Sequence, residues 1–165
     1  MNKRYFVCTL LFFTLQTPAS FSSNSNKVFS FRLSDSLVPY LKIQKDLAND
    51  DFSGVRELAS TWAASLKRDL NINPENKTIN DLLITLENFS KIEKQTQLRI
   101  QFGKISQVVI GYLKVHPTEN KNYQLFFCPM FPQGYAFWIQ SKKEGLSNPY
   151  WGKEMLTCGV RRHFN

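Results

Sequence analysis

The sequence predicts a mainly α-helical protein, an antiparallel four-helix bundle with a C-terminal β-hairpin and loop segment appended to it. Four stretches between residues 34 and 116 repeat apolar residues at intervals of three and four, which is the period of an amphipathic helix. The connections between these stretches are short, so neighbouring helices are expected to run antiparallel. After Pro117 the chain becomes aromatic and is interrupted by proline and glycine, which favours short strands and turns.

The first residues have the layout of a secretory signal peptide, which we predict over residues 1–19. Lys3 and Arg4 precede an apolar run from Phe6 to Leu15, and small residues suit cleavage after Ala19. The apolar run is shorter than the roughly 20 residues that a lasting transmembrane helix needs. We therefore expect an exported protein without a stable membrane span once the leader is removed.

The rest of the chain is expected to form one domain, because its length of 165 residues suits a single core. Residues 20–33 are rich in serine and asparagine and are interpreted as a flexible lead-in, and residues 34–165 as the folded domain. The formal net charge of +8 falls by two when Lys3 and Arg4 leave with the signal peptide. The remaining Lys and Arg are spread along the chain without a recognition motif, so we do not expect nucleic-acid binding.

The four helices are expected in order along the chain, each bounded by a cap or a helix-breaking residue. A turn of Asn and Asp separates the first helix from the second, and a segment that contains Asn and Pro separates the second from the third. Pro117 disfavours helix at the residue before it, so the fourth helix should end there. The expected ranges are 34–49 with Ser34 or Asp35 as cap, 52–70, Thr78 or Asn80 to an end or kink near 94–97, and 98–116.

Two short strands and one helical turn are expected in the C-terminal segment. The strands are predicted from Tyr123 to Cys128 and from Tyr135 to Ile139, on either side of a loop with two prolines. The tail from Asn148 is expected to be mostly turns, with a single helical turn from Lys153 to Leu156.

The candidate chemistry lies in four sulfur-containing side chains, Cys128, Met130, Met155 and Cys158. Alternate residues of an extended segment point the same way, and residues three apart share a helix face, so each pair can turn toward one ion. Thiolate and thioether sulfur are soft ligands that select Cu(I), and by the same chemistry Ag(I). If the two segments meet, the sequence predicts a soft-metal site.

A structural disulfide is the alternative, because an exported pair of cysteines commonly forms one. A Cys128–Cys158 bridge would close a loop of about 30 residues and stabilise the fold by roughly 3–4 kcal/mol. The protein would then be an interaction module whose aromatic tail binds a partner, and its methionines would serve only for packing. The aromatic residues of that surface are Phe131, Tyr135, Trp138 and Trp151.

The remaining polar residues favour a binding protein over an enzyme. Cys128 and His163 are the nearest nucleophile and base, and no orienting or oxyanion-stabilising group accompanies them. His163 is interpreted as a solvated side chain, and His116 as a favourable charge at the negative end of the fourth helix when protonated. Arg99 is expected on a solvated charged face, and the alternative is that it pairs with a carboxylate on another helix, Asp46 or Glu57.

Several elements of the sequence together match a known family: residues 40–51, Arg99, Phe102, Ser106, the Cys-Pro-Met motif at 128–130, Trp138 and the motif Asn-Pro-Tyr-Trp-Gly-Lys-Glu-Met-Leu-Thr-Cys-Gly at 148–159. In these elements the chain resembles an exported bacterial domain that occurs alone or fused to the C-terminal end of periplasmic adaptor subunits of copper/silver efflux systems. The resemblance covers nearly all of the chain from about residue 34 to 159. It implies a helical bundle with an appended motif, a periplasmic or otherwise exported location in the bacterial envelope, Cu(I) or Ag(I) as the ion, and such an adaptor as the partner.

The resemblance assigns the metal-binding positions to Cys128, Met130, Met155 and Cys158. The sequence departs from the family in the loop after Met130, where small residues are expected and Phe131 and a second proline stand instead. The function implied is that of an exported protein that sequesters Cu(I) or Ag(I) or transfers it to an efflux system.

Overall fold

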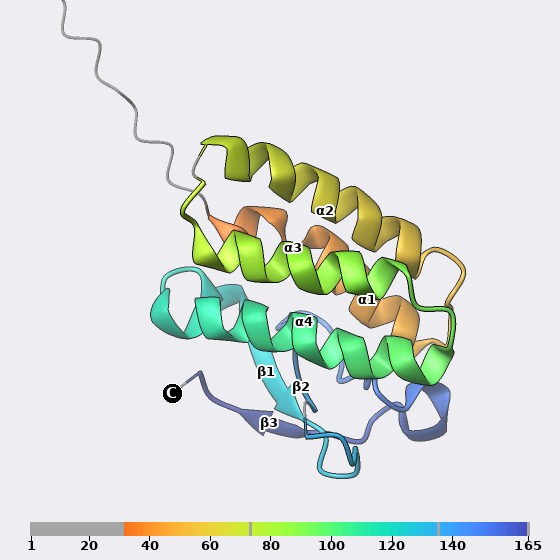
Figure 1. Ribbon diagram of the computed structural model, residues 1–165. Coiled ribbons are helices and arrows are strands. Elements are labelled where there is room, and N and C mark those ends of the chain that lie inside the picture. The colour runs from red at the N-terminus through yellow and green to blue at the C-terminus, as the bar shows by residue number, and fades with distance from the viewer. Residues whose placement is uncertain (1–31, 73, 135, 165) are drawn as a thin grey trace, which may run out of the picture. The chain divides into compact units, whose positions relative to one another are not determined.

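The computed structural model describes residues 32–72, 74–134 and 136–164 (Figure 1). The expected signal peptide, residues 1–19, lies outside the described residues, as does the expected lead-in up to residue 31. The described part is mainly helical and ends in a small antiparallel sheet of three strands. Within it, no helix is both long enough and apolar enough to cross a membrane.

The four helices expected from the apolar periodicity are all present. Each keeps an apolar face because its buried residues recur at intervals of three and four, as in Leu82, Leu83, Leu86 and Phe89. The helices are α1 (Val38–Ala48), α2 (Val55–Ile72), α3 (Lys77–Ser90) and α4 (Gln95–Val115).

The start of the first helix differs from the expectation. The α-helix begins only at Val38, and the residues before it form a short 3₁₀ helix, Leu33–Ser36. Pro39 explains the difference, because proline is accommodated in the first turn of an α-helix but not in its interior. Leu33 is fully buried, so core packing already begins at this residue.

The ends of the later helices are set by local caps. The Asn76 side chain accepts a hydrogen bond from the Ile79 amide at 3.1 Å, so α3 begins with this cap rather than with Thr78 or Asn80. The fourth helix begins at Gln95, three residues earlier than expected. It ends before His116, as Pro117 predicts.

The sheet contains the expected hairpin and one strand more. β1 (Tyr123–Phe127) pairs antiparallel with β2 (Phe137–Ser141) and, on its other side, with β3 (Val160–Arg162), so the order is β2-β1-β3. β3 was not expected, because three exposed residues carry no alternating apolar pattern. The expected helical turn of the tail is a 3₁₀ helix, Gly152–Met155.

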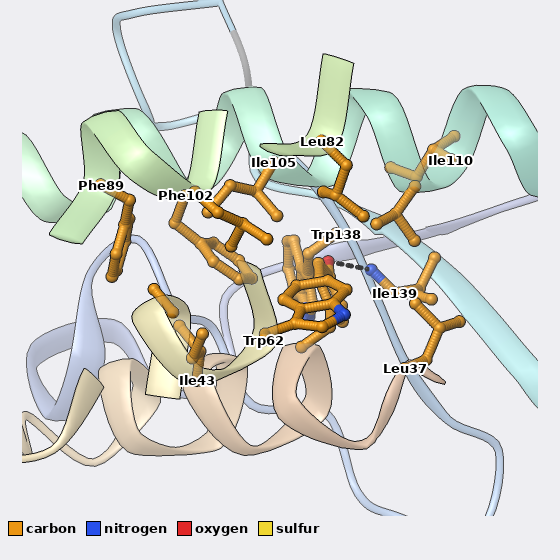
Figure 2. Close-up of a cluster of buried hydrophobic side chains, with 14 of the residues drawn as sticks. Leu37, Ile43, Trp62, Leu82, Phe89, Phe102, Ile105, Ile110, Trp138 and Ile139 are labelled. Carbon is orange, nitrogen blue, oxygen red and sulfur yellow. Dashed lines mark hydrogen bonds between the residues drawn. The ribbon is translucent and has the colours of Figure 1, made fainter. Parts of the chain in front are cut away.

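The helices form two layers on one side of the sheet. α1 and α4 pack against β2, whereas α2 and α3 lie farther from the sheet and pack against each other (Figure 1). Trp62, Phe102 and Trp138 belong to the buried core between these layers (Figure 2). The buried Tyr40 hydroxyl bonds the Ser106 hydroxyl at 2.8 Å and accepts the Ile139 amide at 3.1 Å, which ties α1 to α4 and β2.

Candidate metal centre

The pairing of β1 with β3 brings the two cysteine segments together. Cys128 directly follows β1, and Cys158 lies two residues before β3. Because the two strands are antiparallel and Phe127 pairs with Val160, both cysteines lie at the same end of the sheet. The Cys128 amide also donates to the carbonyl of Ala136 at 2.9 Å, which anchors this end to the strand β2.

The two cysteines are free thiols and close neighbours. Cys128 is completely buried, and Cys158 is partly exposed. Burial, together with the neighbouring Cys128, raises the pKa of the Cys158 thiol above its ordinary value. The structure therefore places side by side two sulfur atoms from segments about 30 residues apart.

The side chain of Asn148 holds both cysteine segments. Its amide nitrogen donates to the Cys128 sulfur at 3.2 Å and to the Cys158 carbonyl at 2.6 Å. Its oxygen accepts the Tyr150 amide at 2.8 Å, and its own main-chain N–H donates to the Leu156 carbonyl at 2.7 Å. Asn148 is completely buried, so this amide is the bridge that fixes the position of one thiol relative to the other.

Next to Cys158, the main chain at Gly159 passes very close to the ring of Trp138. A Cβ atom added at Gly159 would lie 2.7 Å from the ring of Trp138, which is fully buried in the core. Only glycine lets the chain next to Cys158 pass so close to the indole. The Trp138 ring thus packs directly against the segment that carries Cys158.

The methionines lie on the same two segments but in different surroundings. Met130 is 57% exposed two residues after Cys128, so its side chain is open to solvent, whereas the Cys128 thiol is buried. Met155 is half-buried in the 3₁₀ helix, and its carbonyl accepts the Cys158 amide at 3.0 Å. Of the four predicted ligands, the structure thus brings the two thiols close together and leaves Met130 exposed.

The tail that carries Met155 and Cys158 is anchored to the helices by Arg99. The buried guanidinium donates to the carbonyls of Leu47, at 2.9 Å, and Pro149, and it pairs with Asp50 at 2.5 Å. The other Asp50 oxygen accepts the Lys153 amide at 3.0 Å. One ion pair thus links α4, the end of α1 and the C-terminal segment.

The carboxylate partner of Arg99 corrects the expectation from the sequence. Asp46 pairs with Lys42 on the same helix, and Glu57 lies on the exposed side of α2, whereas Asp50 follows α1 with a positive φ of 57°. Gly152 passes so close that an added Cβ would lie 1.9 Å from the Asp50 carboxylate.

The remaining residues singled out in the sequence lie in separate places, the aromatic ones beside Arg99 and the two histidines away from it. Phe131 packs against Tyr150 with ring centroids 4.7 Å apart, and with Trp151 these residues line an open cleft of about 420 Å³ next to Arg99. His163 is exposed beyond β3, and His116 accompanies the end of α4. Tyr135 lies outside the described residues.

The donor set of the site is sulfur rather than carboxylate or imidazole. In the described part of the chain, no group of three or more His, Cys, Asp or Glu side chains could hold a metal ion. Two neighbouring thiols, with a thioether on each adjoining segment, fit a soft monovalent ion and not Mg²⁺ or Ca²⁺.

The sequence indicates residues 148–152 as a turn that supports the site, but not that the Asn148 side chain bonds both cysteine segments. The partners of this buried amide lie on segments far apart in the sequence, so no local pattern identifies them.

Comparison of the chain with protein-family models, with curated proteins and with solved structures finds no match.

Proposed function

We propose that this is an exported protein that binds Cu(I) or Ag(I) through Cys128 and Cys158, with Met130 and Met155 supplying thioether sulfur. The observation that supports the proposal is the proximity of two free cysteines, from separate segments, at one end of the sheet. Thiolate and thioether ligands select soft ions such as Cu(I). We infer that the protein sequesters the ion or transfers it within the bacterial envelope.

The gradient of exposure across the sulfur residues favours transfer over storage. Cys128 is buried, Cys158 is partly exposed and Met130 is open to solvent, so an incoming donor or acceptor can reach the outer sulfur first. A single site per chain is a poor reservoir. In this proposal the acceptor is a periplasmic adaptor of a metal efflux system, the protein has no catalytic role, and the helices form the antiparallel bundle expected from the sequence.

The test is an anaerobic Cu(I) titration of the reduced protein without its leader, in competition with a chromophoric chelator. We expect one ion per chain, a complete loss of competition in Cys128→Ser/Cys158→Ser, and weaker binding in Met130→Leu/Met155→Leu. Ile84→Leu is the matched control, since Ile84 is an exposed apolar residue on α3, 59% accessible to solvent. Failure of the reduced wild-type protein to compete with the chelator would contradict the proposal.

A disulfide-stapled interaction module is the second candidate, and the same proximity of the thiols favours it, because a disulfide requires neighbouring sulfur atoms. In that case the cysteines would be oxidised in the exported protein and the partner would bind Phe131 and Trp151, because Trp138, expected on the same surface, is fully buried in the core. Met130→Leu/Met155→Leu would then leave partner binding unchanged. Mass spectrometry of the protein from the periplasm, after alkylation of free thiols, distinguishes the two states by the mass of two bound alkyl groups.

A further inference from the structure

The two edge strands of the sheet, β2 and β3, differ in whether their outward-facing backbone groups are hydrogen-bonded, and those of β2 are. The outer edge of β2 is covered by tyrosine hydroxyl groups, since Tyr40 accepts the Ile139 amide at 3.1 Å and Tyr150 donates to the Phe137 carbonyl at 2.5 Å. Both tyrosines are almost completely buried. No further strand can pair at these positions without displacing them.

Among the residues that the structure describes, none pairs with the outer edge of β3, and the hydrogen-bond register identifies the groups that face outward. The bond from the Cys128 amide to the Ala136 carbonyl shows that even-numbered residues of β1 bond to β2, so odd-numbered ones face β3. Leu125 therefore bonds to Arg162 and Phe127 to Val160, and the N–H and C=O of Arg161 point away from the sheet. All three residues of β3 are exposed.

A groove with an apolar floor and a basic rim lies beside this edge. Residues directly opposite each other in an antiparallel pair share a face, so Arg162 lies on the face of Leu125, and its guanidinium is 5.7 Å from the centre of the Phe127 ring. The groove has a volume of about 400 Å³ and runs between α4 and the sheet. Its floor includes Ile110, Leu125 and Phe137, and its rim Lys114, Arg162 and His163.

We propose that β3 and this groove bind an extended acidic segment of a partner protein, which adds a fourth strand to the sheet. Main-chain bonds to Arg161 would align the segment, and an apolar side chain would enter the groove. Carboxylates at the alternate positions would lie on the opposite face of the sheet, beside the exposed Arg161 side chain. A second copy of this chain fits less well, because pairing two β3 strands would oppose arginine with arginine.

The proposed docking site lies close to the two cysteines. β3 begins two residues after Cys158, so a strand added there would place the partner next to the thiol pair. The peptide-binding surface is independent of copper, whereas its role in metal transfer rests on the proposed function. The inference thus specifies the metal acceptor as a protein that presents an acidic, extended segment.

The experiment measures binding of a fluorescein-labelled peptide of alternating glutamate and valine residues to the reduced, metal-free full domain, by fluorescence anisotropy. Arg161→Pro removes the outward N–H and leaves the ladder to β1 intact, because that N–H does not bond to β1. Arg161→Gln keeps the N–H and removes only the charge. We expect saturable binding that weakens by at least about tenfold in Arg161→Pro and by about 1.5- to 5-fold in Arg161→Gln.

Several results would overturn the proposal. These are the absence of binding by the wild-type protein, equal binding by Arg161→Pro, and equal binding of a peptide with lysine in place of glutamate. Concentration-dependent dimerisation that protects the amide of Arg161 from exchange would instead assign the edge to a second copy. Cu(I) affinity measured in parallel separates the two proposals, since Arg161→Pro should leave it unchanged.

Discussion

Replacement of Asn148 by alanine tests how the cysteine site is held together. The change deletes the donor to the Cys128 sulfur and leaves the Cys158 carbonyl and the Tyr150 amide without their partner. An unsatisfied buried polar group costs about 1–3 kcal/mol, so two such groups give a loss of about 2–6 kcal/mol in the free energy of unfolding. For a domain of this size, a loss in the middle of that range lowers Tm by about 10 °C.

The assay is equilibrium urea unfolding in reducing buffer, followed by the Cu(I) competition titration of the same sample. Asn49→Ala is the matched control, because Asn49 also donates its side-chain amide to a carbonyl, that of Lys45 at 2.9 Å, but on an exposed surface. The control should lose less than about 1 kcal/mol. An Asn148→Ala protein as stable as the control, with unchanged Cu(I) affinity, would refute the bridging role of this amide.

Two glycine substitutions test the close backbone contacts around the site. Gly159→Ala places a Cβ 2.7 Å from the Trp138 ring, so overpacking of about 1–3 kcal/mol and weaker Cu(I) binding are expected in urea unfolding and chelator competition. Gly152→Ala adds a Cβ 1.9 Å from the Asp50 carboxylate at a positive φ of 60°, and disrupting the part-buried, charged hydrogen bond between Asp50 and Arg99 should cost about 1.5–3 kcal/mol. Gly145→Ala, with no atom within 4 Å of the added Cβ, is the control for both, and equal stability of all three variants would contradict these contacts.

The helices could be predicted from the sequence because their signal is local. Apolar residues three and four apart define a helical face, and Pro117 marks the end of α4 without any knowledge of the tertiary structure. The helix ends that differ from the prediction are those where several neighbouring residues could serve as the cap, as in α3, which is capped by Asn76 and not by Thr78. β3 could not be predicted, because a short exposed strand is specified by its pairing with β1 rather than by its own residues.

The candidate site was predictable in its chemistry but not in its geometry. The residue types of Cys128 and Cys158 indicate soft-metal or disulfide chemistry, yet whether they meet depends on the register between β1 and a strand that the sequence did not indicate. The partner of Arg99 is non-local in the same way, because Asp50 reaches it only through the left-handed turn after α1. Contacts between distant segments decide both cases.

The most direct measurement of the central claim is X-ray absorption at the copper edge of the reduced protein loaded with one equivalent of Cu(I), beside the Cys158→Ala variant. A site built on the two thiols predicts a first coordination shell of sulfur alone in the wild-type protein, with fewer sulfur neighbours or no bound copper in the variant. A shell containing nitrogen or oxygen, or a sulfur shell unchanged in Cys158→Ala, would contradict it.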